Sequence, residues 1–108
     1  MIPLLLAAAL ETIPLNPEDT KGQRLFMLSA AAAKLCLLDG VPDPHFTEEL
    51  HSFFRAINED YPGHKKWFKR EHTADGARML STLLNDECRI PDPKTRNLFI
   101  RLAQPYLN

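Results

Sequence analysis

The longest apolar run in the chain lies between residues 25 and 38, where only two polar side chains interrupt it. A helix that is apolar on almost every side is surrounded by other helices and is not half exposed to water. The sequence therefore predicts a central helix that begins after Asn16 and runs to about Asp39. Gly40 follows, and glycine is the residue type favoured just past a helix end.

Two later segments carry apolar residues at helical spacing on one face. The first holds Phe46, Leu50, Phe53, Phe54, Ile57 and Tyr61. The second is expected to point Leu98, Phe99, Leu102 and Tyr106 inward. Three Asn-Pro or Asp-Pro pairs indicate helix starts, because the side-chain oxygen caps a free N–H and proline suits the first helical position. These pairs are Asn16-Pro17, Asp43-Pro44 and Asp92-Pro93.

The segment between these helices is basic and less regular. Pro62-Gly63 ends the preceding helix. Thr73 is a candidate N-cap for a helix that buries Ala77, Leu80 and Leu84, and whether residues 64–85 form one helix or two stays open because Gly76 weakens a continuous helix. No segment alternates apolar and polar residues as a strand does. We therefore predict an all-α fold, a single domain over residues 1–108 built as a compact bundle of five or six helices.

The sequence also contains an internal echo. Met27-Leu28-Ser29 followed by Cys36 and Pro42-Asp43-Pro44 is matched by Met79-Leu80-Ser81 followed by Cys88 and Pro91-Asp92-Pro93. Each set describes a helix, a loop and a second helix that starts at Asp-Pro. The echo predicts two tandem helical hairpins, with chance similarity as the alternative.

The run from Ala30 to Asp43, with Glu48-Glu49-Leu50 behind it, resembles the TerB-like family of tellurite-resistance TerB proteins and the amino-terminal domains of DjlA-type co-chaperones. In that family an apolar helix turns through Asp-Gly into a second helix with an acidic start. The resemblance implies an all-helical fold with a duplicated hairpin and a non-catalytic role in binding a partner protein near the membrane. In the second half of the chain, Arg89-Ile90 stands where the family has Asp-Gly. The acidic metal-binding surface of the family is therefore not expected in this chain.

Charge and cysteine content change this picture only slightly. The net charge of −1 divides into −5 for residues 1–63 and +4 for residues 64–108. Two cysteines, Cys36 and Cys88, are too few for a disulfide scaffold or a zinc site. We expect them to be small buried thiols in a reducing, cytoplasmic compartment, and whether they pair stays open.

The apolar segment Met1–Leu10 lacks the basic residues of a signal peptide and is too short to span a bilayer. We expect residues 1–15 to pack on the core or on a second copy of the chain.

The chain shows little that is typical of an enzyme. It has no Gly-rich phosphate loop, no nucleophile elbow and no complete EF-hand or H-E-x-x-H motif. The nearest approach to a metal site is His45, Glu49 and His51, which would need ligands from elsewhere. We expect no catalytic residue, no cofactor and no bound metal.

Two charged regions are the candidate partner-binding surfaces. The acidic one consists of Asp39, Asp43, Glu48 and Glu49, and the basic one of Lys65, Lys66, Lys69 and Arg70. The favoured hypothesis is a non-catalytic interaction domain that binds a protein. The alternatives are a nucleic-acid-associated protein whose basic helix face also uses Arg78, contact with a membrane surface, and a subunit or homo-oligomer docked through Met1–Leu10.

Overall fold

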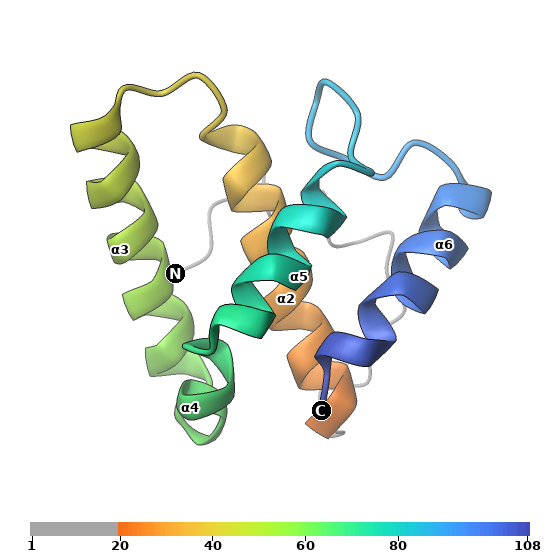
Figure 1. The fold of residues 1–108 in the computed structure, drawn as a ribbon, viewed down its shortest axis with the longest axis horizontal. Helices are drawn as coiled ribbons and strands as arrows, with labels where there is room; N and C mark the ends of the chain where they lie inside the picture. The colour runs from red at the N-terminus through yellow and green to blue at the C-terminus, as the bar shows by residue number, and fades with distance from the viewer. Residues whose placement is uncertain (1–19) are drawn as a thin grey trace.

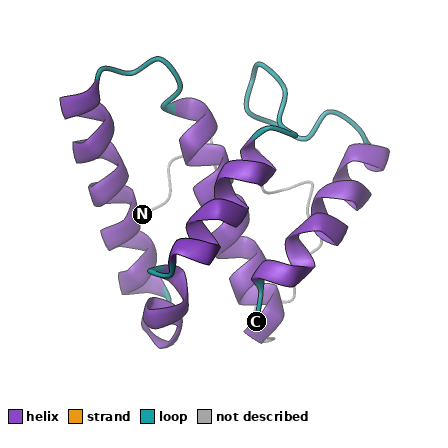
Figure 2. Cartoon of the chain, viewed as in Figure 1, coloured by secondary structure: helices purple, strands orange, loops and turns teal. Residues whose placement is uncertain are grey.

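The computed structural model describes residues 20–108, and in this range the chain is helical with no strand (Figure 2). The elements are α2 (Thr20–Leu37), α3 (Asp43–Asp60), the 3₁₀ turn η1 (Pro62–His64), α4 (Lys65–Phe68), α5 (Glu71–Ser81), α6 (Pro93–Ala103) and the 3₁₀ turn η2 (Gln104–Tyr106). The prediction of an all-α bundle is confirmed.

Helix α2 is the centre of the bundle, as the apolar run predicts. It crosses α5 in the most extensive helix–helix contact, with α3 beside it on one side and α6 on the other (Figure 1). Eight of its residues are buried: Leu25, Met27, Leu28, Ser29, Ala30, Ala31, Ala32 and Ala33. Ala30, Ala31, Ala32 and Ala33 are four consecutive small residues, and small side chains allow neighbouring helices to approach α2 closely. Gly40 ends the segment at φ 81°, a left-handed conformation that glycine adopts without steric cost.

The predicted helix starts meet different outcomes. Asp92 caps α6, and its carboxylate accepts from the Thr95 N–H at 2.7 Å. Asp43 does not cap α3, since it already lies in the first helical turn behind Pro42, and no side chain caps that helix. The Asn16-Pro17 start lies outside the described residues.

Thr73 is also not the cap that the sequence indicates. Helix α5 begins two residues earlier, at Glu71, and the Thr73 side chain is buried. Its hydroxyl donates to the Trp67 carbonyl at 2.7 Å and so ties α5 to α4. Residues 64–85 therefore form two separate helices followed by a loop.

Aromatic residues of the basic segment enter the core, as their position on the helix indicates. Trp67 and Phe68 are buried, whereas the neighbouring lysines are exposed. The stripe on α3 is confirmed, since Phe53 and Ile57 are buried. On α6 the prediction is partly wrong: Phe99 is buried, but Leu102 is 36% exposed, because Phe99 and Ala103 are the residues of this helix that face the core.

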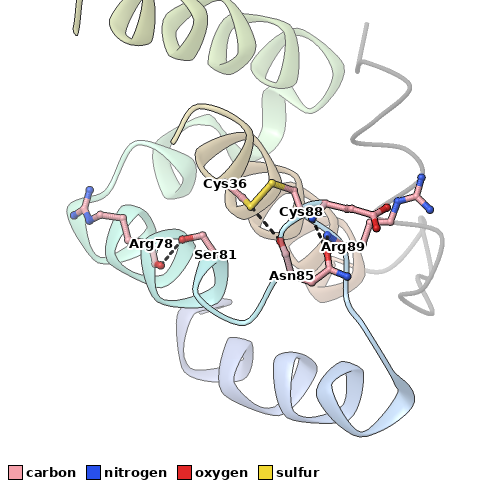
Figure 3. Close-up of a disulfide and its surroundings, with 7 residues drawn as sticks. Cys36, Arg78, Ser81, Asn85, Cys88 and Arg89 are labelled. Carbon is pink, nitrogen blue, oxygen red and sulfur yellow. Dashed lines mark hydrogen bonds between the residues drawn. A yellow bond between two sulfur atoms is a disulfide. The ribbon is translucent and has the colours of Figure 1, made fainter. Parts of the chain in front are cut away.

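The cysteines are not free thiols; they form a disulfide that links the end of α2 to the loop after α5 (Figure 3). Their Cα atoms lie 5.7 Å apart, within the range that a disulfide spans. Cys88 has φ 60°, which is uncommon for a residue with a side chain. The Asn85–Arg89 loop maintains this conformation. The Asn85 side-chain oxygen accepts the N–H groups of Glu87 and Arg89, both at 3.0 Å.

The disulfide joins equivalent positions of the internal echo. Helices α2 and α3 form one consecutive pair and α5 and α6 another, and α2 and α5 cross between them (Figure 1). The two cysteines that correspond in the echo thus meet at the same end of this crossing. This is the arrangement expected of two hairpins packed face to face.

None of the described helices is both long enough and apolar enough to span a membrane. The predicted packing of residues 1–15 and of Met1–Leu10 lies outside the described residues.

Gly76 provides a test of the contact between α5 and the carboxyl-terminal turn. A Cβ at Gly76 would lie 2.6 Å from the ring of Tyr106. This ring packs on the ring of His72. The backbone carbonyl of Tyr106 accepts a hydrogen bond from Trp67 Nε1 at 2.8 Å. We predict that Gly76→Ala lowers the free energy of unfolding by about 1–3 kcal/mol in urea denaturation. Gly63→Ala is the control, since a Cβ there meets nothing within 4 Å. Equal stability of the two variants would contradict this packing.

The disulfide should contribute strongly to stability, because the bridged residues are 52 positions apart in the sequence. Closing a loop of that size restricts the unfolded chain and stabilises the fold by about 2–4 kcal/mol. We predict that Cys36→Ala/Cys88→Ala loses this amount in urea unfolding, and that dithiothreitol destabilises the wild type but not the double variant. A wild-type midpoint that is unchanged by the reductant would show that the bridge is not formed.

Candidate functional site

A groove with an apolar floor lies between α3 and α5 in the described part of the chain. Its volume is about 420 Å³, within the range of roughly 300–1,000 Å³ found for sites that bind small ligands. It is lined by Ala31, His51, Phe54, Arg55, Asn58, Phe68, Lys69, Arg70, Thr73, Ala74 and Ala77. Four helices thus contribute to it, although only α3 and α5 form its long walls.

Helical spacing explains how each wall is built. On α3, His51, Arg55 and Asn58 stand at i, i+4 and i+7 and share one face. The opposite wall holds Thr73, Ala74 and Ala77 of α5, where Ala77 follows the other two by three and four residues and so lies on the same side of the helix. The α3 wall is therefore polar and the α5 wall has small side chains, which leaves space between the two helices.

The floor of the groove is apolar. Ala31 of α2 lies between the walls, and the rings of Phe54 and Phe68 meet edge to face with their centroids 5.3 Å apart. Ala31 and Phe68 belong to the buried core, against which Phe54 packs. The floor therefore joins the groove directly to the packed interior.

The rim of the groove is positively charged. Arg55, Lys69 and Arg70 are exposed, as is His51, and no lining residue is acidic. Among residues 20–108 the ion pairs are Lys34–Glu49 and Arg78–Asp75, so neither Arg55 nor Lys69 has a carboxylate partner there. Arg70 donates to the backbone carbonyl of Asn108. The rim presents cations to solvent above an apolar floor.

The structure divides the basic candidates into two pairs. Lys69 and Arg70 line the groove, whereas Lys65 and Lys66 are exposed on α4 and do not reach it. Arg78, which the nucleic-acid hypothesis adds, pairs with Asp75 on α5.

The acidic candidates lie at the opposite end of α3. Asp39 is in the turn after α2, while Asp43, Glu48 and Glu49 belong to the first part of α3 (Figure 1). All four are exposed, and Glu49 accepts from Lys34 at 3.1 Å. The acidic and basic surfaces are therefore separate, and none of the four acidic residues lines the groove.

Sequence reasoning missed Arg55, Asn58 and Ala74 as candidates. A signal was present on α3, since His51, Arg55 and Asn58 recur at helical spacing beside the apolar stripe. No comparable signal marks Ala74, because an alanine lines a groove only where a neighbouring helix diverges.

A second polar cluster surrounds His64, but its groups satisfy one another. Its Nδ1 accepts from Arg24 Nε at 3.3 Å, so Nε2 carries the proton and donates to Gln23 Oε1 at 2.7 Å. Burial, with a further contribution from the Arg24 charge, lowers the pKa of His64, in agreement with a neutral ring. Arg24 also donates to the Leu107 carbonyl at 2.7 Å and lies 5.0 Å from the centroid of Trp67. This cluster fastens the carboxyl-terminal turn to α2.

Among the residues that line the groove there is no serine and no cysteine. Its only hydroxyl, that of Thr73, donates to a backbone carbonyl inside the fold. Across residues 20–108, no three His, Cys, Asp or Glu side chains are placed to hold one metal ion. What the lining offers is apolar contact on the floor and charge at the rim.

Comparison with known proteins gave no match to a family model, to a curated protein or to a solved structure.

Proposed function

We propose that the domain is a non-catalytic interaction module that binds a partner protein through the groove between α3 and α5. The observation that carries this proposal is the combination of an apolar floor, continuous with the packed core, and a cationic rim. Apolar floors provide most of the binding energy in such sites, while polar rims set orientation and specificity.

The shape of the groove supports a protein partner. Two helices that diverge over a third leave an open groove, and an amphipathic helix whose apolar side chains enter such a groove is a common mode of protein recognition. A nucleic acid would be expected to use exposed aromatic side chains among the cations. Here Trp67 and Phe68 are 4% and 9% exposed, which makes the nucleic-acid alternative the weaker proposal.

The TerB-like resemblance also favours an interaction domain. Its supporting features are the Asp39-Gly40 turn between α2 and α3 and the two consecutive helix pairs. On this proposal the chain shares with the family the arrangement of its helices. The binding surface is the groove between α3 and α5 and not the acidic residues Asp39, Asp43, Glu48 and Glu49.

The disulfide bears on where the domain works. Disulfides persist in oxidising compartments and are uncommon in the cytoplasm, where thiols are kept reduced. The bridge between Cys36 and Cys88 therefore supports an oxidising compartment over the cytoplasmic location that the composition suggested.

Filling the groove tests the proposed function. Ala74→Phe places a ring against the α5 wall, and we predict that it weakens retention of the partner at least about tenfold in quantitative affinity capture from the native source. Ser52→Phe is the matched control, because Ser52 is an exposed residue of α3 that does not line the groove. Circular dichroism verifies that both variants fold. Proteins captured equally by both variants and the wild type would contradict the proposal.

A further inference from the structure

The charges around the groove point to a particular kind of partner. Every ionisable side chain that lines it is basic, namely His51, Arg55, Lys69 and Arg70. The chain as a whole carries a net charge of −1. Arg55, Lys69 and Arg70 are therefore a local concentration of positive charge on a nearly neutral molecule, and such a surface favours ligands that bring negative charge.

The basic groups stand on both walls. His51 and Arg55 come from α3, whereas Lys69 and Arg70 come from the turn that leads into α5. A ligand seated on Phe54 and Phe68 would therefore have cations on either side of its apolar face. That pattern is complementary to a helix with an apolar stripe flanked by carboxylates.

We infer that the groove binds an amphipathic acidic helix of a partner protein, with apolar side chains on the floor and Glu or Asp side chains beside Arg55, Lys69 and Arg70. This inference rests on the proposed function and specifies the chemistry of the partner. Apolar anchors at i, i+3 or i+4 and i+7 would follow the length of the groove. Arg55 and Lys69 have no ion-pair partner among residues 20–108, so both side chains are available to pair with the carboxylates of the ligand.

A bilayer surface fits these features less well than a helix does. The aromatic side chains of this region are recessed in the floor, where Phe68 is 9% exposed, whereas membrane-binding surfaces present their apolar residues outward. A flat surface would meet the cations of the rim but not the floor. The apolar part of the site is used only by a ligand narrow enough to enter.

The test uses the full chain and three synthetic peptides of about 15 residues, because shorter isolated helices are marginal in water. All carry the same leucine stripe, flanked by glutamate, glutamine or lysine. Dissociation constants are measured by fluorescence anisotropy at physiological salt, where charges further apart than about 8 Å are largely screened. We expect the glutamate peptide to bind at least about tenfold more tightly than the lysine peptide.

Charge reversal makes the test specific to the groove. Arg55→Glu/Lys69→Glu should invert the preference, so that the lysine peptide binds more tightly than the glutamate peptide. Lys65→Glu/Lys66→Glu is the matched control, because it makes the same change in net charge at exposed residues outside the groove. This control should retain the preference for glutamate.

Other outcomes would overturn the inference in distinguishable ways. If all three peptides bind equally and Ala74→Phe abolishes binding, the groove is a docking site but its partner is not acidic. Binding that Ala74→Phe does not alter would refute the proposed function as well. If no peptide binds, but vesicles of phosphatidylserine and phosphatidylcholine bind and Arg55→Glu/Lys69→Glu weakens that binding, the occupant is a membrane. A wild type that dimerises in sedimentation, with Ala74→Phe monomeric, identifies a second copy as the occupant.

Discussion

The crossing of α2 and α5 is the contact on which the rest of the structure depends. It is the most extensive contact between two helices of the described chain, and the Cys36–Cys88 disulfide fixes its end. Helix α3 packs on the outer side of α2, and α6 packs on the outer side of α5 (Figure 1). The bundle is consequently a pair of hairpins held by their first helices.

This arrangement also explains the groove. Helix α3 packs mainly on α2, and α5 has small side chains on the face that looks toward α3. Because α2 supports both walls, the space between them stays open above Ala31 without loss of the core below. The candidate binding surface is therefore a consequence of the same crossing that stabilises the fold, and the cations of the rim come from the loop and helix that border this space.

The fold could be predicted from the sequence to a large extent, whereas the candidate site could be predicted only in part. The apolar run of α2 and the stripe of α3 report burial directly, since periodicity depends only on local spacing. The Cys36–Cys88 pairing and the exposure of Leu102 depend on how distant helices are oriented, which spacing does not determine. For the same reason the sequence identifies Lys69 and Arg70 as part of a basic surface but does not predict that they line one groove together with Arg55.

Native-state hydrogen exchange measured residue by residue tests the central claim most directly. If α2 and α5 form the supporting unit, the amides of Ala30–Ala33 and of Ala77–Leu80 should exchange only through global unfolding and be the slowest in the domain. Those in the second half of α3, beside the open groove, should exchange through smaller openings and faster. Protection in α3 equal to or greater than that in α2 would contradict the account, because α3 would then be part of the supporting unit and not a wall held on one side.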